Sequence, residues 1–229
     1  MRKPSHVLKS LEDQARNEEY TFDRLYRNLY NPEFFYEAYN NIAKSQGSMT
    51  AGADGLTLDD MTDARINRII ASLKDHSYQP NPARREYIAK QNNPGRTGKQ
   101  HAKRATSPAK KRPLGIPSTD DKLVQEIVRM ILEAIYEPTF SDYSHGFRPK
   151  RSCHTALRSV KHRFIGTDWV IEGDIKACFD SFDHHVLINI LRRRIKDEHF
   201  ISLIWKMLRA GYLEQWIYHD TYTGTPQGG

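Results

Sequence analysis

Apolar residues recur at helical spacing along much of the chain. The pattern predicts helices over residues 5–45 and 60–75, and again over 184–195 and 198–210. Gly211 follows the last of these and is placed to end it. The chain is therefore expected to be mainly helical.

The helix predicted over residues 121–137 has the clearest pattern. Ser118, Thr119 or Asp120 can cap its start, and Pro138 follows its end. Its charged surface places Arg129 one turn from both Glu126 and Glu133, so that it can pair with either acid. Its apolar stripe consists of Leu123, Val124, Ile127, Val128, Ile131 and Ile135. We expect this broad stripe to form part of the core.

Short runs between the helices have the character of strands. Residues 84–90 and 112–116 lie on either side of a polar segment and predict a strand and its return. The apolar run 169–171 predicts a buried strand, and residues 213–223, with aromatic side chains at alternate positions, predict another.

The charge of the chain is concentrated in one segment. The 229 residues include 35 Lys and Arg against 28 Asp and Glu, a net charge of +7. Residues 84–112 hold ten basic side chains and a single acid, Glu86, so the rest of the chain is slightly acidic. The part from 91 to 111 predicts an exposed loop that can bind phosphate groups, with an anionic membrane surface as the alternative. The candidate nucleic-acid-binding residues here are Arg84, Arg85, Lys99, Lys103, Arg104, Lys110 and Lys111.

Composition excludes several classes of protein. The only cysteines, Cys153 and Cys178, form no C-x-x-C pair, so neither a zinc ribbon nor a redox motif is supported, and we expect two buried reduced thiols. The N-terminus lacks the apolar stretch of a signal peptide, and no apolar run reaches the length of a membrane span. We expect a soluble protein without membrane partners.

Asp174 is the residue with the clearest potential for chemistry. It follows the predicted strand 169–171 and stands next to Gly173, which has no side chain to obstruct a ligand. A carboxylate at the end of a buried strand is costly unless a cation meets it, and phosphoryl-transfer enzymes use such carboxylates to hold two divalent ions about 4 Å apart. The alternatives are that Asp174 caps a turn or pairs with a lysine. Asp180 and Asp183 compete for the role, although Asp183 has the position of a helix cap.

Four motifs together resemble the reverse transcriptases encoded by group II introns, also called intron maturases. The stretch 51–55 and the strand before Lys90 also resemble the N-terminal extension of that family, and the similarity spans roughly residues 30 to 229. The motifs, in the order of the family, are Arg112-Pro113-Leu114-Gly115-Ile116-Pro117, His145-Gly146-Phe147-Arg148-Pro149, Gly173-Asp174-Ile175-Lys176-Ala177-Cys178-Phe179-Asp180 and Gly224-Thr225-Pro226-Gln227-Gly228-Gly229.

The resemblance implies an α+β fold with the fingers and part of the palm of a right-hand polymerase, helix-rich with a small antiparallel sheet. It divides the chain into an N-terminal helical extension (1–30), fingers with the basic loop 91–111 (31–165) and a partial palm (166–229). The thumb and the family's Tyr-Ala-Asp-Asp motif are absent, so we expect a truncated chain that is inactive by itself. The full-length parent would be the enzyme.

The resemblance also implies roles for residues of the palm. Asp174 would be the first catalytic aspartate and would bind Mg²⁺ together with the backbone carbonyl of Ile175. Phe179 would pack under the sugar of the incoming nucleotide and exclude a 2′-hydroxyl, with a core position beside Phe182 as the alternative. Gln227 would contact the incoming nucleotide.

The fingers would supply the remaining contacts. Lys90 and Arg112 resemble the residues that grip the triphosphate, and Lys110 or Lys111 can replace Lys90 because the loop between them is long and rich in lysine. The basic residues after the Gly-Phe-Arg-Pro turn would lie near the template strand, unless they only begin a solvated helix. They are Arg148, Lys150 and Arg151.

The resemblance therefore predicts an RNA-directed DNA polymerase with two-metal nucleotidyl transfer that also binds its intron RNA for splicing. Its partners would be an intron RNA template, a primer strand and deoxynucleoside triphosphates, in the cytoplasm of a bacterium, and a homodimer is left open. The alternatives are a non-catalytic RNA-binding splicing cofactor, and a related bacterial reverse transcriptase of the retron or CRISPR-associated class.

Overall fold

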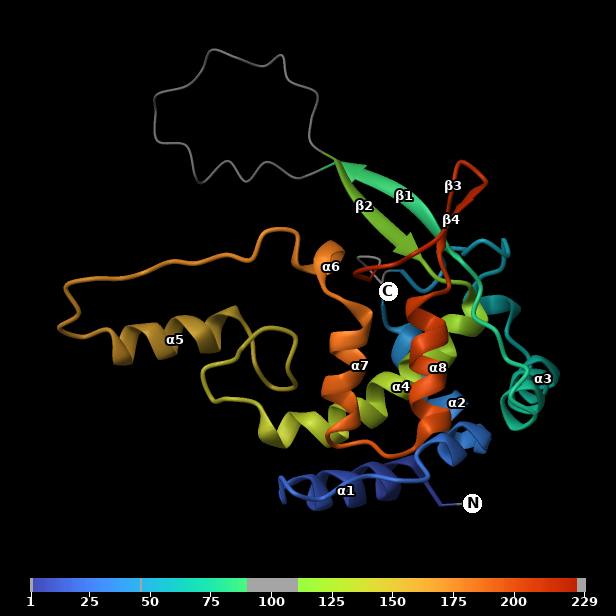
Figure 1. Cartoon of the computed structure of the whole chain (residues 1–229), viewed down its shortest axis with the longest axis horizontal. Helices are drawn as coiled ribbons and strands as arrows, with labels where there is room; N and C mark the ends of the chain where they lie inside the picture. Colours follow the sequence, from blue (N-terminus) through green and yellow to red (C-terminus); the bar gives the residue numbers. More distant parts are fainter. Residues whose placement is uncertain (1, 46, 90–110, 226–229) are drawn as a thin grey trace, which may run out of the picture.

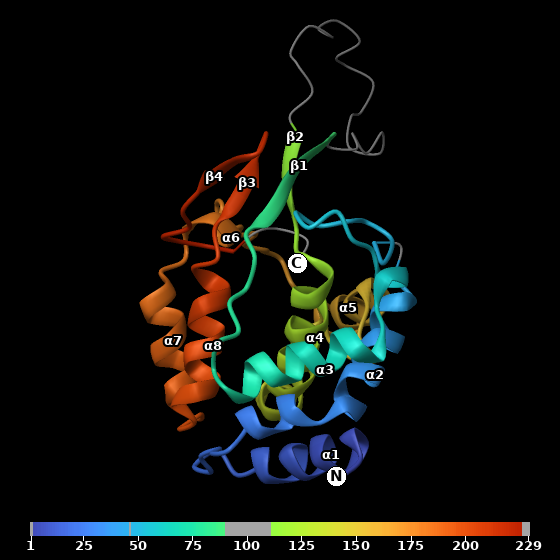
Figure 2. The same ribbon diagram turned by 90° about the vertical axis from the view of Figure 1, so that its right-hand side faces the viewer.

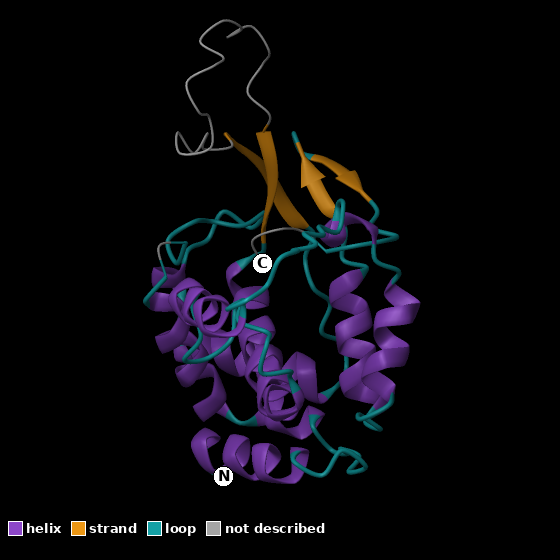
Figure 3. Ribbon diagram, turned by 90° about the vertical axis from the view of Figure 1, so that its left-hand side faces the viewer, coloured by secondary structure: helices purple, strands orange, loops and turns teal. Residues whose placement is uncertain are grey.

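A four-stranded sheet lies over one end of a group of helices (Figure 1, Figure 3). The computed structural model describes residues 2–45, 47–89 and 111–225. The predicted helix-rich α+β class is confirmed by this arrangement.

Helix α4 (Thr119–Tyr136) is the centre of the first group of helices. It packs against α1 (Pro4–Ala15) and α2 (Pro32–Ala43), while α3 (Asp63–Lys74) lies against α2 (Figure 2). The apolar stripe of α4 is buried as predicted, and α1 and α2 pack against this helix. The apolar residues of α4 with no exposed surface are Leu123, Val124, Ile127, Ile131 and Ile135.

Short 3-10 segments and caps join these helices. The segments are η1 (Tyr26–Tyr30), η2 (Leu58–Asp60) and η4 (Glu137–Thr139), the last of which follows α4 directly. Asn31 caps α2 by accepting a hydrogen bond from the amide of Glu33. The two ion pairs predicted for the surface of α4 are both present, since Arg129 contacts Glu126 and Glu133.

Helices α7 (His184–Arg192) and α8 (Glu198–Leu208) form a second group and run side by side (Figure 1). Asp183 and Asp197 cap them by accepting hydrogen bonds from backbone amides of the first turn. Asp197 also accepts a hydrogen bond from the amide of Tyr26 at 2.7 Å, which ties this group to the first one.

The sheet has the strand order β2-β1-β3-β4 and is mixed, so the predicted antiparallel sheet was wrong in one pairing. Strands β1 (Ala83–Ala89) and β2 (Lys111–Ile116) are antiparallel, as are β3 (Tyr212–Glu214) and β4 (Ile217–His219). Strand β3 pairs with β1 in parallel. Helices α4 to α8 lie between them in the sequence and provide the long crossover that a parallel pair requires.

Two strand predictions need correction. The single strand predicted over 213–223 is a hairpin, because Gln215 and Trp216 both adopt positive φ (50° and 67°), as in the two-residue turns that join antiparallel strands. Residues 169–171 form no strand and are 67–99% exposed. No strand among the described residues pairs with them, so their apolar pattern has no sheet in which to be buried.

Helix α5 (Cys153–Arg163) is set apart from the other helices, and the short helix α6 (Cys178–Ser181) lies just before α7 (Figure 1). Neither contains a buried residue. Cys153 and Cys178 each stand at the first position of one of these helices and are exposed, so the prediction of buried thiols was wrong.

In the part of the chain that the structure describes, no helix is both long enough and apolar enough to cross a membrane.

Candidate functional site

Asp174 lies in an irregular, exposed segment that connects α5 to α6. The neighbouring Ile175 is 72% exposed, and a Cβ added at Gly173 would meet no atom within 4 Å. The carboxylate is therefore accessible to a ligand from solvent, although it does not stand at the end of a buried strand as predicted. Asp174 is positioned by an irregular loop and not by a strand of the sheet.

Asp174 was predicted to bind Mg²⁺, which requires further donor atoms close to its carboxylate. Among residues 2–45, 47–89 and 111–225, no group of three or more His, Cys, Asp or Glu side chains is arranged to hold a metal ion. The exposed oxygens of Asp174 suit Mg²⁺, which prefers such ligands, but these residues by themselves do not complete a metal site.

Phe179 lies in α6, five residues beyond Asp174, and is 52% exposed. The alternative of a core position is wrong, since it is Phe182 that packs against the core. The backbone carbonyl of Phe179 accepts a hydrogen bond from the amide of Thr225 at 2.7 Å, so its turn is fixed to a distant part of the chain.

The basic residues at the base of the sheet have internal partners. Arg84 donates two hydrogen bonds to the carbonyl of Ala51, at 2.9 and 3.2 Å, and pairs with Glu86 at 2.6 Å. Arg85 stacks on the ring of Tyr212, with 3.4 Å between the guanidinium carbon and the ring centroid. Both side chains therefore stabilise the sheet.

Lys111 and Arg112 differ from them. They are exposed on β2, where Arg112 stands opposite Ile88 of β1. Both side chains are free to reach an anionic ligand in solvent. The predictions for Lys90, Lys99, Lys103, Arg104, Lys110 and Gln227 fall outside the described residues.

The turn after residue 145 is held by its own arginine. The side chain of Arg148 is only 7% exposed, forms an ion pair with Glu137 at 2.9 Å and donates to the carbonyls of Ser141 and Ser144. Arg151 pairs with Asp142 at 2.9 Å, and Lys150 is exposed. Of the three predicted template contacts, Lys150 presents its charge most freely to solvent.

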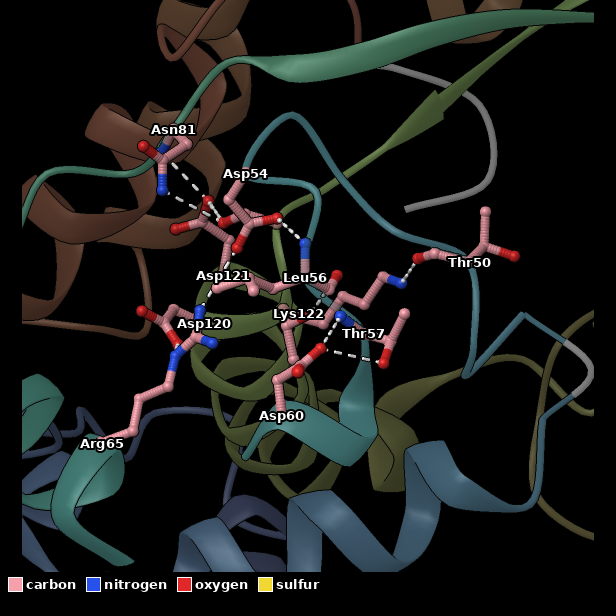
Figure 4. Close-up of polar contacts among 12 residues, drawn as sticks. Thr50, Asp54, Leu56, Thr57, Asp60, Arg65, Asn81, Asp120, Asp121 and Lys122 are labelled. Carbon is pink, nitrogen blue, oxygen red and sulfur yellow. Dashed lines mark hydrogen bonds and ion pairs between the residues drawn. The ribbon is translucent and has the colours of Figure 1, made fainter. Parts of the chain in front are cut away.

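The loop 47–60 packs tightly on the start of α4 (Figure 4). A Cβ at Gly52 would lie 2.5 Å from the carbonyl oxygen of Pro117, so only glycine fits there. Lys122 donates a hydrogen bond of 2.6 Å to the carbonyl of Thr50, and burial lowers the pKa of its ammonium group. This close packing explains in physical terms why a glycine stands at position 52.

Ion pairs extend this packing to α3. Arg65 contacts Asp120 at 2.6 Å and Asp54 at 3.2 Å, joining α3 to the start of α4 and to the loop (Figure 4). Thr57 and Asp60 close the loop with a reciprocal cap.

Asp121 is the buried centre of a second polar cluster. Its carboxylate accepts hydrogen bonds from the hydroxyls of Tyr78 and Ser118, both at 2.5 Å, and from the amide of Asn81 at 3.0 Å. Burial raises the pKa of this carboxyl, against the effect of the three donors. The cluster connects the segment that enters β1 with the start of α4, and no sequence motif indicated it.

A comparison with known protein families identifies the family of this chain. The family model described as reverse transcriptase (RNA-dependent DNA polymerase) matches residues 88–229, more than half of the chain. The chain belongs to the reverse transcriptase family. The resemblance to this family inferred from its four motifs is thereby confirmed.

Two of the similar proteins are named after introns. The group II intron-encoded protein LtrA of Lactococcus lactis subsp. cremoris is 50% identical over 218 residues, which are 95% of this chain and 34% of that protein. An uncharacterized 91 kDa protein in the cob intron of Schizosaccharomyces pombe is 47% identical over 229 residues, 97% of this chain and 26% of that protein. The chain thus spans about a third or less of the length of these relatives.

A solved structure agrees on the fold. A chain of a partial Cas6-RT-Cas1--Cas2 complex superposes with a TM-score of 0.53 at 19% identity, covering 90% of this reverse transcriptase chain and 32% of the other. At 19% identity, the match supports a shared fold and nothing further. Reverse transcriptases as a family generally use a divalent metal.

Proposed function

We propose that the intact gene product is an RNA-directed DNA polymerase of a group II intron, which also binds its intron RNA during splicing. The observation that carries this proposal is the 50% identity to a group II intron-encoded protein over 95% of the chain. Its partners would be an intron RNA template, a primer and deoxynucleoside triphosphates, in the cytoplasm of a bacterium.

In the reaction, the 3′-hydroxyl of the primer attacks the α-phosphorus of the nucleotide and pyrophosphate leaves. Bound Mg²⁺ would supply positive charge to the reacting phosphates. Asp174 would provide one carboxylate ligand and Ile175 a carbonyl oxygen. The exposed ring of Phe179 would lie under the sugar, and Gln227 would contact the nucleotide.

The triphosphate would be held from the fingers. The exposed guanidinium of Arg112 offers a fork of donors suited to phosphate oxygens. A lysine of the basic loop, at position 90, 110 or 111, would add a point charge. The domain division proposed here is an extension over 1–30, fingers over 31–165 and part of a palm over 166–229.

The test is primer extension on an RNA template with the intact gene product. Asp174→Asn removes one carboxylate from an exposed loop and should lower extension at least about 100-fold while the circular dichroism spectrum stays unchanged. Asp168→Asn, at another exposed aspartate six residues earlier, is the matched control and should keep full activity. Activity that survives Asp174→Asn would remove this residue from the mechanism.

A splicing cofactor without polymerase activity is the second candidate, favoured by the net charge of +9 on residues 84–112. In that case the protein should bind intron RNA with an affinity that falls steeply with salt. Replacing the lysines and arginines between 96 and 111 by glutamine should abolish the binding. Binding without any dependence on salt would contradict this candidate.

A further inference from the structure

His184 is buried, with 1% of its surface exposed, although it belongs to a polar part of the sequence. It is the first residue of α7, and Asp183 fixes that end of the helix through the amides of His185 and Val186. The imidazole packs near Phe182 and edge-on to Trp205, with ring centroids 6.1 and 6.2 Å away. The ring is thus held between α7 and α8.

Within the described part of the chain, the imidazole makes one hydrogen bond, to the backbone of Gly224. Its Nε2 lies 2.7 Å from the carbonyl oxygen of Gly224. Because a carbonyl can only accept, Nε2 carries the hydrogen. The other nitrogen, Nδ1, is buried and has no hydrogen-bond partner among the described residues. The hydrogen bond to Gly224 is therefore the polar contact that His184 makes within the described residues.

The segment 223–225 is in turn fastened to the turn that carries Phe179. Thr225 donates its amide to the carbonyl of Phe179 at 2.7 Å, and Gly224 donates to the carbonyl of Phe182 at 2.8 Å. The hydroxyl of Thr223 donates to the carbonyl of Asp180 at 3.1 Å.

Gly224 is required for this approach. Its φ is +69°, and an added Cβ would lie 2.2 Å from the carbonyl oxygen of Phe179. Two parts of the chain that are 45 residues apart thus share one backbone junction, which we call the 223–225 junction. Pro226 and Gln227 follow it directly in the sequence.

We infer that His184 is a positioning residue of the nucleotide site, which fixes the 223–225 junction and thereby the turn that presents Phe179 to the sugar of the incoming nucleotide. This inference rests on the proposed function. His184 touches no substrate and acts through the carbonyl of Gly224.

Kinetics of the intact gene product test the inference. His184→Leu keeps an apolar filling but removes the donor, and should raise the KM for deoxynucleotides about 3- to 10-fold, the range expected for one hydrogen bond, with kcat within about twofold. Discrimination against ribonucleotides should fall by a similar factor. His184→Gln places an amide donor near the position of Nε2 and should restore both values. His185→Gln, next to it but exposed, is the control.

Hydrogen exchange gives a readout besides activity. Peptides covering residues 220–226 should exchange faster in His184→Leu than in the wild type and in His184→Gln, while α4 keeps its protection. If His184→Leu does not fold, His184→Asn takes its place, since its shorter amide does not reach Gly224.

Two results would overturn the inference alone: unchanged KM and exchange in His184→Leu, or equal defects in His184→Leu and His184→Gln, which would indicate a role in packing only. A wild-type protein that cannot extend a primer would instead overturn the proposed function, and this inference with it.

Discussion

Replacing Asp121 by alanine is the sharpest test of the polar cluster at the start of α4. Asp121 is 1% exposed, and its carboxylate accepts three hydrogen bonds, from Tyr78, Asn81 and Ser118. Alanine would leave three buried donors without an acceptor, each at a cost of about 1–3 kcal/mol. Water can reach some of them after the side chain is lost, so we expect a loss of about 4 kcal/mol in the free energy of unfolding.

The Asp121→Asn variant separates charge from hydrogen bonding. The amide keeps one acceptor oxygen and the volume of the side chain, and should cost about 1–2 kcal/mol. Because burial raises the pKa of Asp121 in the folded protein, the folded state holds its proton more tightly than the unfolded chain does. The contribution of the wild-type carboxyl to stability is therefore complete below the unfolded pKa of about 4 and declines as the pH rises through the folded pKa.

Urea denaturation followed by tryptophan fluorescence, at pH values from 4.5 to 7.5, measures both effects. The difference in stability between the wild type and Asp121→Asn should be largest at the acidic end and shrink as the pH rises. A loss of less than 1 kcal/mol in Asp121→Ala, or a difference that grows with pH, would refute this account of the cluster.

Three further substitutions follow from the geometry. Gly52→Ala places a Cβ 2.5 Å from backbone atoms of residues 117 and 118 and should cost about 1–3 kcal/mol in urea denaturation, whereas Gly47→Ala meets nothing within 4 Å and should be neutral. Arg148→Lys loses the fork of donors to Glu137 and to two carbonyls, so hydrogen exchange over residues 140–150 should accelerate while α4 is unaffected; unchanged exchange would show that the turn does not depend on the guanidinium. Phe179→Ala in the intact gene product should raise ribonucleotide incorporation about tenfold or more, and unchanged sugar selectivity would reject its role under the sugar.

The helices could be predicted because their local pattern and their tertiary environment agree. The stripe of α4 repeats at 3.6 residues and is buried in the core, with α1 and α2 packed against the helix, so periodicity alone locates it. Asp183 was likewise predictable as a cap, because a capping aspartate needs only the amides of the turn that follows it.

The sheet and the site depend on contacts that no local pattern contains. The apolar run 169–171 resembles a buried strand, but a strand is buried only where another strand and a covering layer are present. The motif containing Asp174 was visible in the sequence, whereas the contact between His184 and Gly224 joins residues 40 positions apart and has no periodic signal. The hairpin turn at Gln215 and Trp216 requires positive φ at both residues. Neither residue type favours positive φ, so the sequence gives no signal for this turn.

Two sets of contacts position the proposed site, and mutations in each set should have different effects. The cluster around Asp121 and the packing of Gly52 join the base of β1 and β2 to the core, so their loss removes free energy of unfolding. The 223–225 junction instead joins an exposed turn to an adjacent segment, where little apolar surface is buried. Its loss should therefore change nucleotide KM and sugar selectivity with little change in global stability. Variants of the two groups should fall into separate classes when stability and selectivity are measured on the same proteins.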